Sequence, residues 1–178
     1  MTQVFFKLVL FLFFLHDDSP NHSVCSKMLM RLKVITLRGG ARNLSTTSTG
    51  KGPRVGFIGL GNMGASMATN LLKTYPNLLV YDIVPENVSK LVSLGATAAS
   101  SPSSLAKESD VIITMVPATS HVRSLLQGSN GLFASASKGT LFIDSSTIDP
   151  LASKELIGEA NSKGFKMIDA PVVGNNVD

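Results

Sequence analysis

The feature that most constrains the fold of this chain is a glycine-rich turn, whose glycines are spaced as G-x-G-x-x-G. It reads Gly59-Leu60-Gly61-Asn62-Met63-Gly64. The apolar run Arg54 to Ile58 precedes the turn, and an apolar stripe with spacings near four residues runs through Asn62 to Lys73. A short apolar run that ends in glycine predicts a buried parallel strand, and the stripe predicts an amphipathic helix. The folded part therefore opens with a strand, a tight turn and a helix.

Strands and helices continue to alternate after this first unit. We predict strands at Leu78–Asp82, Thr97–Ala99, Asp110–Val116, Thr140–Asp144 and Phe165–Asp169. We predict helices at Pro85–Leu94, with Val88, Leu91 and Val92 facing inward, at Ser101–Lys107, at His121–Gln127, and from Pro150 with Asp149 as its cap. The alternation specifies an α/β fold, a doubly wound parallel sheet of the Rossmann type, which binds ligands outside the carboxyl ends of its strands.

The glycine turn and an acidic residue after it together indicate a dinucleotide cofactor. The first glycine allows the tight turn, the second lets a diphosphate approach the backbone, and the third lets the helix pack on the strand. Asp82 ends the next predicted strand, 18 residues after Gly64, where its carboxylate accepts hydrogen bonds from ribose hydroxyls. This carboxylate repels a 2′-phosphate, and Ile83 and Val84 supply no arginine, so we expect NAD rather than NADP. A glycine turn without a ligand is the structural alternative.

The charge distribution argues against a nucleic-acid-binding protein, and the cysteine content indicates the kind of compartment. The chain has 16 Lys and Arg against 12 Asp and Glu, a net charge of +4. Most of this excess precedes the predicted fold, since no acidic residue occurs between Ser19 and Tyr81. The remainder is nearly balanced and lacks basic residues interleaved with aromatic ones, so we expect no nucleic acid partner. The single cysteine, Cys25, also precedes the fold, which favours a reducing compartment.

The first part of the chain has the traits of targeting segments. The uninterrupted apolar run Leu8–Leu15 is shorter than the about 20 residues that a membrane span needs, so we predict no span. Residues 28–52 contain no acid and are rich in arginine, serine and threonine, which is typical of a mitochondrial transit peptide. We therefore expect a targeting or disordered region at 1–52, a folded domain at 53–178 and a mitochondrial matrix location. A secretory signal at Leu8–Leu15 and a disordered tail are the alternatives.

Several motifs resemble one known family. Phe57 to Asn70, FIGLGNMGASMATN, is similar to the signature of the 3-hydroxyisobutyrate dehydrogenase family of β-hydroxyacid dehydrogenases. IITMVP from Ile112, IDSSTIDP from Ile143 and DAPV from Asp169 follow in the family's order. The resemblance implies NAD-dependent hydride transfer with a short 3-hydroxy acid, in valine catabolism. It also implies homo-oligomers for full-length members and leaves the oligomeric state of this chain open.

The resemblance implies roles for residues that follow the later strands. Val116 and Pro117 would lie against the adenosine side of the cofactor, and Thr147 would hydrogen-bond near the nicotinamide. Ser145 and Gly174 would contact the substrate. Hydroxyl groups at the carboxyl end of a strand are well placed to orient a carboxamide or ribose. Alternatively, they only form hydrogen bonds within the loop and at the start of the next helix.

The family pattern changes after Val172. Family members continue from DAPV into Ser-Gly-Gly, whereas this chain continues with Val173, whose side chain cannot donate a hydrogen bond to a substrate carboxylate. The family's catalytic lysine and its all-helical second domain lie beyond Asp178, so we assign no catalytic residue, His121 included, and no metal site. We expect the domain to be truncated at its C-terminal end. Two functions stay open: a 3-hydroxyisobutyrate dehydrogenase-like oxidoreductase, and a catalytically inactive NAD-binding fragment.

Overall fold

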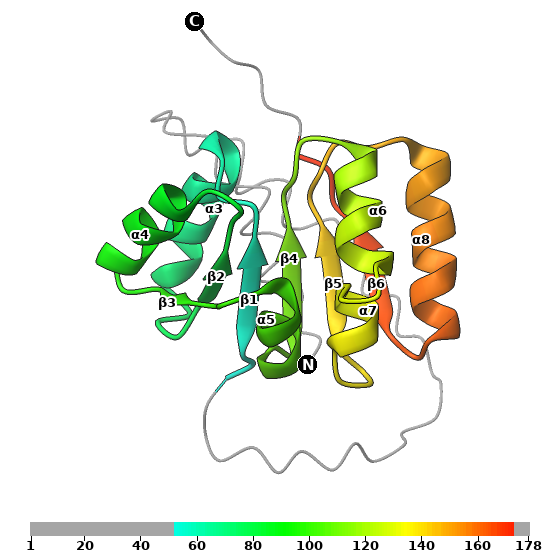
Figure 1. Ribbon diagram of the computed structural model, residues 1–178, viewed down its shortest axis with the longest axis horizontal. Coiled ribbons are helices and arrows are strands. Elements are labelled where there is room, and N and C mark those ends of the chain that lie inside the picture. Colours follow the sequence, from blue (N-terminus) through cyan, green and yellow to red (C-terminus); the bar gives the residue numbers. More distant parts are fainter. Residues whose placement is uncertain (1–51, 173–178) are drawn as a thin grey trace, which may run out of the picture. The chain divides into compact units, whose positions relative to one another are not determined.

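A computed structural model describes residues 52–172 of the chain. The predicted targeting segments before residue 52 and the predicted substrate contact Gly174 lie outside the described residues. One parallel sheet with the strand order β3-β2-β1-β4-β5-β6 forms the centre of the fold (Figure 1). Its strands are β1 (Val55–Ile58), β2 (Leu79–Tyr81), β3 (Thr97–Ala98), β4 (Val111–Thr114), β5 (Leu141–Asp144) and β6 (Lys166–Asp169). The predicted doubly wound sheet is confirmed, and its strand order reverses between β1 and β4.

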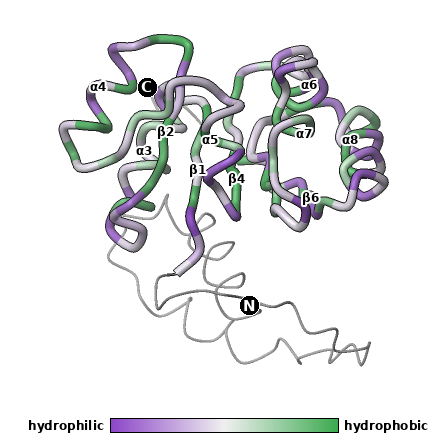
Figure 2. The backbone as a smooth tube through the Cα atoms, turned by 60° about the horizontal axis from the view of Figure 1, so that its bottom comes forward, coloured by the Kyte–Doolittle hydropathy of each residue, from purple (hydrophilic) through white to green (hydrophobic). Residues whose placement is uncertain are grey.

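Helices cover both faces of the sheet. The first face carries α3 (Asn62–Leu72) and α4 (Pro85–Ser93), whose buried residues pack with those of β1 and β2. The second face carries α5 (Pro102–Glu108), α6 (Thr119–Gln127), α7 (Leu132–Ser135) and α8 (Pro150–Ser162). Figure 2 shows α3 and α4 beside β2 at one end of the domain, α6, α7 and α8 toward the other end, and α5 between them near β1. No helix among residues 52–172 has the length and apolar content to cross a bilayer.

The register of the sheet brings the ends of four strands to one level. Ile58 of β1 pairs with Thr114 of β4, Thr114 pairs with Asp144 of β5, and Asp144 pairs with Asp169 of β6. The arrowheads of β1, β4 and β5 point toward the same side of the domain, at the top of Figure 1. The loops that follow these strands therefore emerge together at the carboxyl edge of the sheet.

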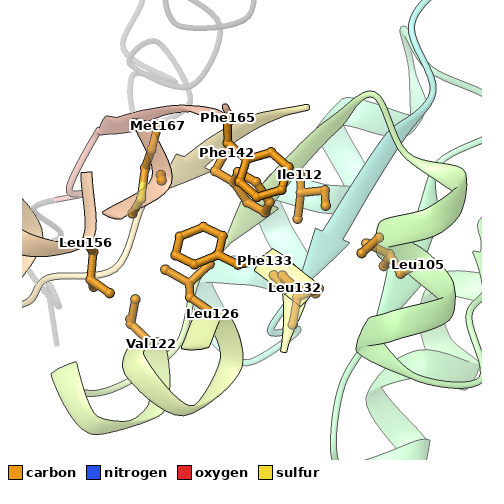
Figure 3. Packing of buried hydrophobic residues seen from close by; sticks show 13 residues of the cluster. Leu105, Ile112, Val122, Leu126, Leu132, Phe133, Phe142, Leu156, Phe165 and Met167 are labelled. Carbon is orange, nitrogen blue, oxygen red and sulfur yellow. The ribbon is translucent and has the colours of Figure 1, made fainter. Parts of the chain in front are cut away.

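One of the two hydrophobic cores lies between the sheet and the second group of helices (Figure 3). Phe142 of β5 meets Phe133 edge-on at a centroid distance of 5.2 Å and meets Phe165 edge-on at 5.4 Å. Aromatic pairs of this geometry contribute about 0.5–1.5 kcal/mol beyond the area that they bury. The core thereby fixes β5, and with it the loop that follows Asp144.

Two sequence-based expectations need correction. Val92 was expected to face inward, but its side chain is 42% exposed because α4 presents Leu91 to the core and turns Val92 toward solvent. The helix α7 was not predicted, since four residues are too few to show a helical period. Elsewhere the predicted elements agree with the structure to within about two residues, and the cap of α8 is confirmed by the bonds from Leu151 N and Ala152 N to Asp149 Oδ1, at 2.7 and 3.3 Å.

Candidate functional site

The glycine turn between β1 and α3 packs against the backbone on two sides. Gly59 has a φ of +94°, and a Cβ added there would lie 2.1 Å from the carbonyl oxygen of Met115 in the loop after β4. A Cβ added at Gly64 would lie 1.9 Å from the carbonyl oxygen of Gly59. Neither position accepts a side chain, because the turn, the first turn of α3 and the loop after β4 are in direct contact.

Gly61 differs from these two glycines, since nothing in the fold requires it to lack a side chain. It is the N-cap of α3 with an ordinary φ of −65°, and a Cβ added there would meet nothing within 4 Å. No side chain caps the helix, and its first turn contains no acidic residue. The first amides of an α-helix have no partner within the helix, and the helix dipole adds positive potential there. This open and uncapped helix start fits an anion such as a diphosphate.

Asp82 lies beside the glycine turn, as the sequence spacing predicted. Leu60 N donates to its Oδ2 at 2.5 Å, and Val84 N donates to its Oδ1 at 2.8 Å. The turn is also tied to the end of β2 by the hydrogen bond from Gly59 N to Tyr81 O at 3.0 Å. Each carboxylate oxygen keeps acceptor capacity for further donors, such as the hydroxyls of a ribose.

The loops after β4 and β5 continue the same edge of the sheet. Val116 N donates to the Ser146 hydroxyl at 2.9 Å, and Pro117 beside it is exposed. Thr147 is exposed as well, and its hydroxyl donates to the carbonyl oxygen of Val172 at 3.2 Å. The predicted adenosine and nicotinamide contacts therefore lie on the same carboxyl edge of the sheet as the glycine turn, which we call the rim: the loops after β1, β2, β4 and β5.

Several polar residues of this rim are buried, among them Asp144, Ser145 and Ser146. Ser145 is fully buried, and its hydroxyl has no hydrogen-bond partner among the described residues. Asp144 is 1% exposed, and its Oδ1 accepts from Thr114 Oγ1 at 2.8 Å and from Ser146 N at 3.1 Å. Burial raises the pKa of the Asp144 carboxyl, against the opposing effect of these hydrogen bonds. Because the Ser145 hydroxyl is inaccessible here, its contact with a substrate stays a prediction.

Some features of the rim were not found from the sequence. Ser146 was noticed only as part of a serine-threonine cluster, and the bond that it accepts from Val116 N depends on the pairing of β4 with β5. The contact of Gly59 with Met115 has the same origin. His121 lies exposed on α6. Residues 52–172 hold no cluster of three His, Cys, Asp or Glu side chains that would bind a metal ion.

Comparison with known proteins gives this geometry a family. Residues 54–178 match the family model described as the NAD binding domain of 6-phosphogluconate dehydrogenase. The chain belongs to this family. The match supports an NAD(P) cofactor for this domain.

The relatives of this NAD-binding domain include the family that the sequence motifs resemble. The chain is 46% identical over 133 residues to a probable mitochondrial 3-hydroxyisobutyrate dehydrogenase of Dictyostelium discoideum, covering 75% of this chain and 41% of that protein. It is 47% identical over 118 residues to the 3-sulfolactaldehyde reductase of Escherichia coli K12, covering 66% of this chain and 40% of the reductase. A solved structure of 3-hydroxyisobutyrate dehydrogenase from Mycobacterium tuberculosis with L-serine superposes with a TM-score of 0.64 at 36% identity, over 69% of this chain and 41% of that chain. The chain therefore spans about two fifths of the length of these relatives.

Proposed function

We propose that this chain is the cofactor-binding part of an NAD-dependent oxidoreductase that acts on a short 3-hydroxy acid, of the 3-hydroxyisobutyrate dehydrogenase kind. The observation that carries the proposal is the junction of the glycine turn with Asp82, through the hydrogen bond from Leu60 N to Asp82 Oδ2. The similarity to 3-hydroxyisobutyrate dehydrogenases supports the reaction class. The bound cofactor would supply the acceptor and donor of hydride in such a reaction.

The residues of the turn hold the diphosphate. Gly61 leaves the start of α3 open, so that the amides of Asn62, Met63 and Gly64 donate to phosphate oxygens. Gly59 and Leu60 form the turn that brings this helix start to the carboxyl edge of β1. Because no acidic residue lies in the first turn of α3, the negative charge of a diphosphate meets the positive end of the helix dipole without repulsion.

Asp82 selects the ribose. Each of its two oxygens already accepts one backbone amide, from Leu60 or Val84, and can accept a further hydrogen bond from a ribose hydroxyl. A 2′-phosphate placed there would meet a carboxylate, and Ile83, which is 87% exposed, provides no positive charge to compensate it. We therefore propose a preference for NAD over NADP.

The far end of the cofactor follows the rim toward β6. Val116 and Pro117 would lie along the adenosine side, and Thr147 would orient the nicotinamide with a hydroxyl that now donates to Val172 O. Ser145 and Gly174 keep their proposed roles near the substrate. The proposed site thus uses residues from the loops after β1, β2, β4 and β5, which the parallel register brings to one edge.

The proposed substrate rests on the relatives, and the proposed location rests on the relatives together with the composition of residues 28–52. The name of the Dictyostelium discoideum protein includes a mitochondrial location, which supports a mitochondrial protein with a transit peptide at residues 28–52. The matrix location and the role in valine catabolism are further parts of the proposal. The similarity to a 3-sulfolactaldehyde reductase shows that related domains serve other small substrates as well. The proposal therefore names 3-hydroxyisobutyrate as the first substrate to test.

Calorimetric titration and a turnover assay test this function in separate steps. We expect the chain to bind NAD saturably and NADP at least about tenfold more weakly, because a 2′-phosphate loses the ribose contacts of Asp82. Failure to bind NAD would contradict the proposal. Reduction of NAD with added 3-hydroxyisobutyrate would support the dehydrogenase, whereas NAD binding without turnover would favour the second candidate, a nucleotide-binding domain without its own catalysis.

A further inference from the structure

We infer that Asp82 is also a positioning residue for the phosphate-binding turn, in addition to its contact with the ribose. This inference rests on the proposed function, because it assigns the turn Gly59–Gly64 to a diphosphate. It differs from that function in predicting that Asp82 contributes to the binding of ligands that have no ribose hydroxyl for it to contact.

The first argument is the position of Leu60. Leu60 is 1% exposed, and its side chain packs in the core with Phe57 and Leu71. A backbone amide at so buried a position needs an acceptor, since an unpaired buried N–H group costs free energy. In this structure the acceptor is a carboxylate oxygen of Asp82 rather than a carbonyl oxygen.

The second argument is that the end of β2 holds two successive amides of the turn. Gly59 N donates to Tyr81 O at 3.0 Å, and Leu60 N donates to the side chain of the following residue, Asp82. The bond to Tyr81 O continues the hydrogen bonding between β1 and β2 by one residue. The bond to the Asp82 carboxylate continues it by one residue more, beyond the end of β2. Asp82 therefore determines where the chain leaves the sheet and turns toward Gly61.

The third argument is that Asp82 is itself held in place. Val84 N donates to its other oxygen at 2.8 Å, which orients the carboxylate toward the turn. Gly61 follows Leu60 directly and caps α3 without a side chain, so a change at Leu60 moves the start of the helix. The open phosphate site at Gly61 thus depends on the carboxylate.

Replacement by asparagine and by alanine separates the two roles. The amide oxygen of Asp82→Asn still accepts from Leu60 N, while the exposed amide of Val84 can bond to water. Asp82→Ala removes the acceptor and leaves the Leu60 amide unpaired, and Asp82→Ser is a second variant whose hydroxyl is too short to reach it. Asp110→Ala is the matched control, because Asp110 also accepts a backbone amide, from Arg54 N at 2.9 Å, at the opposite end of the sheet.

The binding test uses ADP and 2′,3′-dideoxy-ADP as probes, titrated by calorimetry into the whole chain. We expect Asp82→Ala and Asp82→Ser to bind dideoxy-ADP at least about tenfold more weakly than the wild type, the factor that corresponds to a lost bond with a charged acceptor. We expect Asp82→Asn and Asp110→Ala to stay within about threefold of the wild type for this probe. Equal affinity of wild type and Asp82→Ala for dideoxy-ADP would overturn the inference.

Amide hydrogen exchange without any ligand tests the same inference independently of the proposed function. We expect exchange at residues 59–64 to be at least about tenfold faster in Asp82→Ala than in the wild type, and unchanged in Asp82→Asn and Asp110→Ala. Unchanged exchange in Asp82→Ala would overturn the positioning role. A wild-type chain that binds no nucleotide but shows this exchange pattern would refute the proposed function and leave the positioning role supported.

Discussion

Paired substitutions at two glycines of the turn separate a ligand contact from a packing requirement. Gly64→Ala places a Cβ 1.9 Å from the carbonyl oxygen of Gly59, a contact that only a backbone shift relieves. Overpacking of this kind costs about 1–3 kcal/mol, which lowers the melting temperature of a domain of this size by about 3–15 °C. At Gly61 the φ is ordinary and an added Cβ lies in open space. In Gly61→Ala the lower entropy of the unfolded chain stabilises the fold and the loss of a good N-cap destabilises it, so the two effects on the free energy of folding nearly cancel.

We therefore expect Gly64→Ala to lower the melting temperature and Gly61→Ala to weaken NAD binding. Gly61→Ala should melt within about 3 °C of the wild type, yet its methyl group would stand where a diphosphate approaches the backbone. Losing one charge-assisted hydrogen bond, about 1.5–3 kcal/mol, weakens NAD binding by roughly 10- to 100-fold. Thermal melting and calorimetry measure both quantities on the same samples. NAD affinity within twofold of the wild type in Gly61→Ala would refute the placement of the diphosphate, and an unchanged melt of Gly64→Ala would refute the packing argument.

Three further variants test the core, a buried carboxyl group and a half-exposed ion pair. Phe142→Ala removes a ring that Phe133 and Phe165 meet edge-on, and chemical denaturation should show that the free energy of unfolding falls by about 3–5 kcal/mol. A fall of less than about 1 kcal/mol would contradict the packing described for Phe142. Burial raises the pKa of Asp144, so its contribution favours folding at pH values below its unfolded pKa and declines as pH rises toward the folded pKa. Asp144→Asn should flatten this decline, because the amide does not titrate, and stability curves against pH that run parallel for wild type and variant would contradict it. The pKa of Asp110 is lowered by its hydrogen bond to Arg54, so Asp110→Asn should cost less than about 1 kcal/mol at neutral pH, where this half-exposed pair is formed. The cost should disappear as falling pH protonates Asp110, and a cost that persists in acid would argue against the ion pair.

Local sequence signals predicted the order of the elements well. The run Val55–Ile58 and the apolar stripe of α3 carry their own period, and Pro150 with Asp149 marks a helix start wherever the helix lies in the fold. The pairing of Asp82 with the glycine turn was predicted because parallel β1 and β2 end at the same edge. Such features depend on residues that are close in sequence or on a topology that has few alternatives.

Features that depend on contacts between distant residues were not predictable in the same way. The sequence placed Val92 on the inward face of α4, but the helix packs through Leu91 and leaves Val92 exposed. The use of Ser146 as an acceptor follows from the register of β4 and β5, as does the burial of the neighbouring Ser145 hydroxyl, which has no hydrogen-bond partner among residues 52–172. The second role of Asp82 appears only with the hydrogen bond from Leu60, which no spacing rule contains.

The position of the bound nucleotide can be measured directly by titrating NAD into the ¹⁵N-labelled chain and following its amide resonances. If the diphosphate rests on the start of α3 and the ribose on Asp82, the largest saturable shifts will fall on the amides of residues 60–64 and 82–84, with smaller shifts at 116–118 and 147. The amino end of the sheet, around Asp110, should remain unchanged. Shifts concentrated away from the glycine turn, or no saturable shift at all, would contradict the account.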